Sequence, residues 1–346
     1  IYKYAESESA AGNIENAIQH FSRIVKASPN AEISSIGMND AITLAIDNAY
    51  WDTAISTIKL FQHHFPSHEL NPVMSKSLSL AYMKSGQEVS AAKEYERIAK
   101  HENDATVKMA AQWKAAELYE TNNEYLLAIK AYRLFIEQYN APYPQKLEAM
   151  QKLVTLHTDQ DDMSSVNKWY KSILELDSNT SSDEKTDRTN LVASAAALFI
   201  ANKAFERYKS IRLTLPLKQS LNRKKQSMQT AVQYFSQTSA YGVADTATQA
   251  KHSIGEIYQL FGQALLNSER PNDLNDDELE QYDILLEDQA FPFEEKAIEF
   301  FEANLTHAQE GIYDQWIKAS QQQLALLFPA RYQREAKLDN YVNVLH

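Results

Sequence analysis

Histidine and carboxylate side chains are the groups in this sequence that could do chemistry, and three histidines gather in one short stretch. His63, His64 and His68 surround Phe65 and Pro66. Imidazoles in such a cluster can bind a transition metal. No nearby residue completes a recognisable ligand spacing, and imidazoles in the last turn of a helix can interact with its free carbonyl groups instead. We therefore expect no metal and interpret the cluster as the end of a helix.

Adjacent carboxylates occur in three places, namely Asp161-Asp162, Asp276-Asp277-Glu278 and Glu294-Glu295. Acid–base catalysis of glycosidase type needs two carboxylates that face each other across a pocket and differ in pKa. Acids that are neighbours in sequence are explained more simply by the first turn of a helix, where the macrodipole favours negative charge. The motifs GxxxxGK[ST], GxGxxG, GxSxG and HExxH are absent from the sequence. We therefore predict no catalytic residue, no enzymatic activity and no cofactor.

The composition limits the elements that can position any site. The 346 residues include only 7 Gly and 9 Pro, too few for the many turns of a β-sandwich or barrel, so an all-α fold is favoured. Single cores rarely grow beyond about 250–300 residues, which favours a divided or repetitive architecture. The absence of Cys excludes disulfides, and the net charge of −12 argues against a nucleic-acid partner. No apolar run reaches the length of about 18 residues that a membrane span requires.

A repeat of 37 residues organises the first half of the chain. Alanine recurs at this spacing and is followed after four and seven residues by larger apolar side chains, so the three positions form one face of a helix. Breaks between helices recur at the same spacing. The alanines are Ala17, Ala54, Ala91 and Ala128, and the breaks are Gly12, Ala49, Gly86 and Asn123. One hairpin cannot bury its apolar face alone, so stacked hairpins are expected.

This pattern resembles the tetratricopeptide repeat family. The third unit carries the family's small and aromatic positions as Ser79, Tyr82, Ala91, Tyr95 and Ile98, and Pro29 and Pro66 close the first two units. The resemblance implies an all-α fold, a right-handed superhelix of antiparallel helix hairpins, with about five units of 37–38 residues over 1–178. The fifth unit departs from the family pattern, because Val166 replaces the small residue and His157 replaces the Tyr.

A polar loop over 179–187 separates this array from a C-terminal helical region, 188–346, which continues or caps the solenoid. The stretch 191–209 contains no strong break, so longer helices are expected here. Further helices are predicted near 217–240, 244–266, 276–288, 293–308, 312–328 and 330–338. The segment 313–332 resembles the tail of bacterial envelope-associated tetratricopeptide proteins. That resemblance implies a periplasmic location, with a cytoplasmic location as the alternative.

The family resemblance also implies a concave binding face formed by the first helix of each hairpin. The repeat register places on this face Asn39, Thr43, Lys76, Leu80, Met83, Trp113, Glu117 and Gln151. Its apolar members suit an adaptable peptide-binding surface, or alternatively pack beneath a neighbouring repeat. Family members that clamp a carboxylate carry Lys and Asn one turn apart. Leu80 follows Lys76 here, which argues against a carboxylate clamp.

Charge is segregated in the C-terminal half. The segment between Asn202 and Lys225 contains eight Lys and Arg residues and a single acidic residue, Glu206. The segment between Glu269 and Glu310 contains 14 acidic and two basic residues. The basic segment predicts a charged docking surface made of Arg207, Arg212, Arg223, Lys224 and Lys225. Two other interpretations are that the segments face each other within the fold, or that they form two solvated helix faces.

These patterns together predict a non-catalytic scaffold that binds a peptide or protein partner in a bacterial envelope assembly. The alternative is a ligand-binding sensor with a pocket between the array and the C-terminal helices. The sequence does not predict the partner's identity or the oligomeric state.

Overall fold

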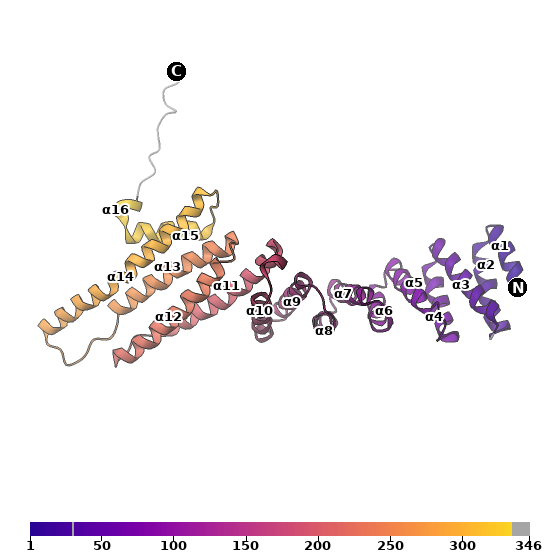
Figure 1. The fold of residues 1–346 in the computed structure, drawn as a ribbon, viewed down its shortest axis with the longest axis horizontal. Coiled ribbons are helices and arrows are strands. Elements are labelled where there is room, and N and C mark those ends of the chain that lie inside the picture. The colour runs from indigo at the N-terminus through magenta and orange to yellow at the C-terminus, as the bar shows by residue number, and fades with distance from the viewer. Residues whose placement is uncertain (30, 334–346) are drawn as a thin grey trace, which may run out of the picture. The chain divides into compact units, whose positions relative to one another are not determined.

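The computed structural model describes residues 1–29 and 31–333, and these residues are all-α (Figure 1). They form 16 α-helices and one short 3-10 helix, with no strand in the described ranges. Contacts divide the chain into two compact units, Ile1–Gln160 and Asp161–His346. The division lies at the turn between α9 and α10, the two helices that correspond to the fifth predicted repeat. The predicted fold class, an α-solenoid of helix hairpins with longer helices toward its C-terminus, is confirmed.

The first unit is a series of short antiparallel helices, coloured indigo to magenta in Figure 1, in which each helix packs on the next. Their bounds are α1 Tyr2–Ala10, α2 Ile14–Ala27, α3 Glu32–Asp47, α4 Trp51–His64, α5 Asn71–Lys84, α6 Glu88–His101, α7 Ala105–Thr121, α8 Tyr125–Gln138 and α9 Tyr143–Thr158.

The buried face of the first unit is the one that the 37-residue repeat predicts. The four repeated alanines on α2, α4, α6 and α8 are all completely buried. Larger side chains one turn further along the helix fill the space between hairpins, as Phe21, Ile58 and Tyr132 do. A small residue at each helix crossing thus permits close approach, and the neighbouring aromatic or aliphatic residue supplies most of the buried apolar area.

The turns between paired helices repeat as well, in backbone conformation more than in residue type. Gly12, Ala49, Gly86 and Asn123 all have positive φ, between 58° and 82°. The residue after each turn donates its N–H to a carbonyl five residues earlier, as in the bonds Tyr50 to Ala45 of 2.8 Å and Gln87 to Tyr82 of 2.9 Å. This is the Schellman arrangement, which ends a helix and reverses the chain.

The second unit has much longer helices. They are α10 Met163–Ser178, α11 Asp187–Ser210, α12 Leu217–Ser239, α13 Ala244–Leu266, α14 Asp276–Gln309, α15 Gln315–Leu327 and α16 Pro329–Tyr332, with the 3-10 helix at Ser182–Glu184 between α10 and α11. Helices α11 to α14 pack in sequence order, each against the next (Figure 1).

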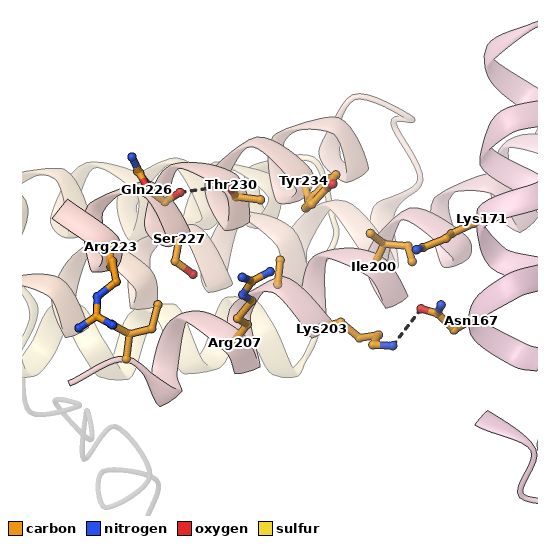
Figure 2. A pocket seen from close by; sticks show the side chains of 12 residues that line it. Asn167, Lys171, Ile200, Lys203, Arg207, Arg223, Gln226, Ser227, Thr230 and Tyr234 are labelled. Carbon is orange, nitrogen blue, oxygen red and sulfur yellow. Dashed lines mark hydrogen bonds between the residues drawn. The ribbon is translucent and has the colours of Figure 1, made fainter. Parts of the chain in front are cut away.

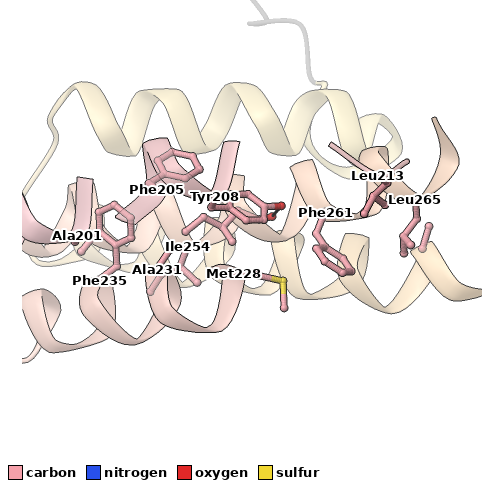
Figure 3. Close-up of a cluster of buried hydrophobic side chains, with 13 residues drawn as sticks. Ala201, Phe205, Tyr208, Leu213, Met228, Ala231, Phe235, Ile254, Phe261 and Leu265 are labelled. Atoms are coloured by element: carbon pink, nitrogen blue, oxygen red, sulfur yellow. Dashed lines mark hydrogen bonds between the residues drawn. The ribbon is translucent and has the colours of Figure 1, made fainter. Parts of the chain in front are cut away.

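A cluster of buried aromatic and aliphatic side chains packs inside this unit (Figure 3). Phe205 and Tyr208 of α11 meet Phe235 of α12 and Phe261 of α13, and all four are buried. The Tyr208 hydroxyl donates a 3.0 Å hydrogen bond to the carbonyl of Ile257, which satisfies the only polar atom of that ring in an apolar setting. This cluster holds α11, α12 and α13 side by side and thereby fixes the groove described below.

Three helix predictions in this unit need correction. Helices were predicted over 276–288 and 293–308, but α14 continues through Pro292 as one helix. The proline lies on the exposed side, where water can satisfy the carbonyl it leaves free, while Leu286, Ala290 and Ala297 continue the buried stripe. Helix α15 begins at Gln315 instead of residue 312. Of the helix predicted near 330–338, Pro329–Tyr332 is helical, and 334–338 lie outside the described residues.

Candidate functional site

The predicted first-helix face of the first unit is most accessible on α5. Lys76 and Leu80 are exposed and Met83 is half-buried, and Leu80 retains 43% exposure. The ammonium of Lys76 pairs at 3.0 Å with the carboxylate of Glu102, which follows α6. Burial of apolar area on this face is therefore incomplete within the first unit.

Trp113 on α7 belongs partly to the core and partly to a small cavity. Its ring packs edge-on against Tyr132 and Phe135 of α8, with centroids 5.5 and 5.1 Å away, and its Nε1 donates to Glu117 at 2.8 Å. The exposed edge lines a cavity of about 370 Å³ together with Met109 and Phe135. Met109 was not among the predicted residues of this face, although it lies one helical turn before Trp113 on the same side of the helix.

The remaining predicted positions of this face are polar. Thr43 is exposed and Asn39 half-buried on α3, where the Thr43 hydroxyl donates to the Asn39 carbonyl at 2.9 Å. Gln151 on α9 is half-buried, and its Oε1 is buried without a hydrogen-bond partner among the described residues. The face therefore offers a mixed surface of hydroxyl, amide, thioether and aromatic groups.

A second candidate site is a basic groove in the second unit, with a volume of about 620 Å³ (Figure 2). It runs along α11 and α12 and receives two side chains from α10. Its cationic lining residues are Lys171, Lys203, Arg207 and Arg223. Arg207 and Arg223 were predicted as docking residues. Lys171 and Lys203 were not part of that prediction, although Lys203 and Arg207 have the i, i+4 spacing that places two side chains on one helix face.

The other predicted docking residues lie outside the groove. Arg212 and Lys225 are exposed elsewhere on the second unit. The prediction that Lys224 is a docking residue is wrong, because this side chain is buried. Its Nζ donates to the carbonyl of Ile211 at 2.8 Å and lies 4.3 Å from the centre of the Tyr208 ring. Burial lowers the pKa of Lys224. The residue binds the free carbonyls at the end of α11 and is not available to a partner.

The basic and acidic segments do not neutralise each other by direct pairing. Among the described residues, no ion pair joins 202–225 to 269–310. The acidic segment makes an internal pair instead, between Arg270 and Asp283 at 2.6 Å. Lys209 pairs with Glu206 on its own helix at 2.5 Å. The basic charge of the groove is therefore left for the solvent or a ligand.

The histidine and carboxylate clusters take positions at helix ends, with one exception. His63 and His64 lie in the last turn of α4, and Asp276 to Glu278 form the first turn of α14, where Glu278 and Asn275 cap each other. Asp162 caps α10. Glu294 and Glu295 are the exception, since they lie inside the continuous α14. No group of three or more His, Asp or Glu in the described residues is placed to hold a metal ion.

A buried histidine network that sequence analysis missed lies between α13, α14 and α15. His252 Nδ1 is 3.0 Å from the Ser320 hydroxyl, which also accepts a 2.9 Å hydrogen bond from Asn304. The rings of Phe301 and Trp316 flank the imidazole, with centroids 5.4 and 5.5 Å away. Burial lowers the pKa of His252 to about 4, which the charge of Asp314 only partly opposes. The imidazole is therefore neutral in the folded protein near pH 7 and serves to join the three helices.

The hairpin geometry and the buried repeat positions define a class of protein, the helical solenoids. Residues 1–31 match the tetratricopeptide repeat family model. Residues 1–31 thus carry a tetratricopeptide repeat, and three further hairpins follow at the same spacing of 37 residues. Such repeats generally mediate protein–protein interaction.

Solved structures with similar architecture come from several organisms. A tetratricopeptide repeat protein from Parabacteroides merdae is 16% identical, with 85% of this chain and 98% of that one covered and a TM-score of 0.32. The C-terminal part of a repeat protein from Cytophaga hutchinsonii is 14% identical, with 81% and 98% covered and a TM-score of 0.34. A signal-transduction ATPase with a tetratricopeptide repeat sensor, from Pyrococcus horikoshii, is 13% identical, with 93% and 44% covered and a TM-score of 0.36.

No curated protein sequence matches the chain. None of the described helices combines the length and the apolar character needed to cross a bilayer.

Proposed function

We propose that this protein is a non-catalytic scaffold that binds a peptide or a partner protein on the first-helix face of its first unit. The observation that carries the proposal is the contrast between the two helices of each hairpin. The second helices bury their repeated alanines completely. The first helices keep Leu80 and Met83 at least partly accessible, and Trp113 beside an open cavity. Incompletely buried Met and aromatic groups on a rigid scaffold are typical of peptide-binding faces.

The proposed setting is a bacterial envelope assembly, with the protein in the periplasm. The Cys-free composition is compatible with an oxidising compartment, and the segment 313–332 resembles envelope-associated repeat proteins. Fractionation of source cells that express the full chain tests this proposal. Release with periplasmic markers supports it, and retention with cytoplasmic markers contradicts it.

Affinity capture with matched variants tests the binding face. The test variant is Leu80→Asp, which places a charge on the first-helix face without disturbing a buried position. The control is Leu126→Asp on the outer helix α8, where the side chain is 78% exposed. The full chain and both variants are used to capture partners from native envelope extract, and their folding is compared by circular dichroism.

We expect Leu80→Asp to lose the proteins that the unmodified chain retains, because a desolvated carboxylate opposes burial of an apolar partner side chain. Leu126→Asp should retain them. If all three chains captured the same set of proteins, the proposal that this face binds the partner would be wrong.

The alternative function, a ligand-binding sensor, is favoured by a cavity of about 570 Å³ in the second unit. Lys185 and Asn190 line it with Tyr234 and Gln237, and its volume is typical of small-molecule sites. A rise in Tm with a small metabolite, abolished by Gln237→Leu, would favour the sensor over the scaffold.

A further inference from the structure

The basic groove of the second unit combines three helices into one continuous lining. The lining residues Ile200, Lys203 and Arg207 follow the spacing of a single face of α11, and Ile211 lies directly after the end of that helix. Arg223 and Tyr234 line the groove from α12. Because α11 and α12 are held by the buried aromatic cluster, this arrangement is built into the rigid part of the unit.

The charge of the groove is not compensated. None of its lining residues is acidic. Lys171, Arg207 and Arg223 make no ion pair or side-chain hydrogen bond within the described residues. Lys203 donates to the neutral amide of Asn167 at 2.9 Å and lies 5.8 Å from the centre of the Phe199 ring, so it too has no carboxylate partner there. Cations gathered in a concave site without counter-charges create a local positive potential that attracts anionic groups. Two of them are guanidinium groups, which bind carboxylates with paired hydrogen bonds.

The cations lie in a row, and this arrangement fits an extended anionic ligand better than a compact one. Figure 2 shows them strung out along the groove, from Arg223 at one end past Arg207 and Lys203 to Lys171 at the other. The part of α11 that lines the groove, from Ile200 to the end of the helix at Ser210, corresponds to about 15 Å at the rise of an α-helix. That length accommodates about five residues of an extended chain. A single phosphate would contact one part of this row only.

The rest of the lining suits a peptide. Ile200, Ala204 and Ile211 provide apolar patches between the charges, against which the aliphatic part of a Glu side chain can pack. Ser227 and Gln226 add neutral hydrogen-bonding groups for a peptide backbone.

We propose that the groove between α11 and α12 binds an extended, acidic peptide segment of a partner protein. This site is independent of the first-helix face, since it lies in the other unit and uses charge where that face uses apolar contacts. The net charge of −12 on the whole chain opposes the approach of an acidic partner, so attachment depends on the local cations. The affinity therefore falls steeply as salt is added, because the Debye length is about 8 Å at 0.15 M ionic strength.

The test measures binding of fluorescein-labelled hexaglutamate to the full chain by fluorescence anisotropy at low and physiological salt, with hexaglutamine as the uncharged reference. The test variant is Arg207→Glu with Arg223→Glu. The control is Arg212→Glu with Lys225→Glu, which changes the net charge by the same amount at exposed positions outside the groove. A second test variant, Arg207→Gln with Arg223→Gln, removes the cations without adding acids. Circular dichroism and Tm verify the fold of each.

We expect hexaglutamate to bind the unmodified chain and hexaglutamine not to bind. The Glu pair in the groove should weaken binding by at least about tenfold and the Gln pair by several-fold, while the control should change it by less than about twofold.

Three results would overturn the proposal. The first is no binding of hexaglutamate at low salt. The second is an equal loss for the groove and control pairs, which would indicate diffuse electrostatic attraction. The third is competition by inorganic phosphate or by oligothymidine at concentrations as low as those of the peptide, which would assign the groove to a compact anion or to nucleic acid.

Discussion

No helix of the first unit exceeds 17 residues, whereas α11 to α14 in the second unit have between 23 and 34. In the first unit, side-chain hydrogen bonds join neighbouring hairpins, as between Tyr119 and Glu96 at 3.0 Å. In the second unit they join positions far apart in sequence, such as His252 and Ser320. The first unit is therefore specified by local, periodic information, and the second by particular long-range pairs. A substitution should accordingly act more severely where a particular pair is broken.

The largest effect should come from acid acting on the buried His252 of the second unit. Its pKa is about 4 in the folded protein and 6.5 in the unfolded chain. The unfolded chain therefore binds the extra proton first as the pH falls. Stability is unaffected above pH 6.5, is lost progressively between pH 6.5 and 4, and changes no further from this group below pH 4. The total loss amounts to about 3 kcal/mol at about 1.4 kcal/mol per pKa unit.

The measurement is the free energy of unfolding by urea at several pH values, for the unmodified chain and for His252→Gln. The amide can still hydrogen-bond Ser320 but cannot titrate. The difference between the two chains should therefore change by up to about 3 kcal/mol between pH 7 and 4. A constant difference over that range would show that the imidazole is accessible to protons in the folded state.

The second largest effect on stability should come from replacing a glycine at a contact between helices. Each unit offers one such glycine. A Cβ added at Gly255 would lie 2.6 Å from the Phe301 ring, which is buried and cannot move aside. A Cβ at Gly37 would lie 2.7 Å from Cδ1 of Ile24, the flexible end of a side chain. Ala gains about 1 kcal/mol over Gly in helix propensity at either position, but overpacking costs about 1–3 kcal/mol where nothing can yield.

We therefore expect Gly255→Ala to lower the free energy of unfolding and Gly37→Ala to leave it nearly unchanged. Thermal unfolding followed by circular dichroism checks both variants. Equal destabilisation would mean that the first unit is packed as rigidly as the second, and would remove the distinction between them.

The smallest effect concerns the repeated turns of the first unit. Ala49 has a φ of 58°, in the left-handed region where glycine is favoured. We expect Ala49→Gly to stabilise the protein by up to about 1 kcal/mol and Gly86→Ala to destabilise it by a similar amount, as measured by urea unfolding. No atom lies within 4 Å of a Cβ added at Gly86, so the change in stability would reflect the backbone conformation and not a clash with a neighbouring residue. The prediction fails unless the changes in the free energy of unfolding have opposite signs in the two variants.

The same contrast explains which features could be predicted from sequence. Ala17, Ala54, Ala91 and Ala128 recur at fixed spacing, so the hairpins and their buried face follow from periodicity alone. Pro292 indicated a helix end, but the buried stripe on both sides of it was the stronger determinant. The helical pattern therefore needed tertiary context to be interpreted correctly.

The candidate sites were predicted less completely, because they depend on which side chains meet. Lys224 and Lys225 are adjacent and chemically equivalent in sequence, yet one is buried against Tyr208 and the other exposed. Lys171 joins the basic groove from α10, outside the segment whose composition indicated a basic surface. His252 gave no sequence signal, since Asn304 and Ser320 reach it only through the packing of α14 and α15.

The recurring left-handed turn bears on how such repeats can diverge. Glycine, alanine and asparagine all occupy this position, while the reversal and its hydrogen bond stay the same. The reversal is therefore compatible with three residue types, although glycine adopts the left-handed conformation at the lowest cost. Residues 1–31 match the family model, and the turn geometry recurs beyond them through Asn123. Along the first unit, the spacing and the backbone conformation of the turns are thus more regular than the amino acids that form them.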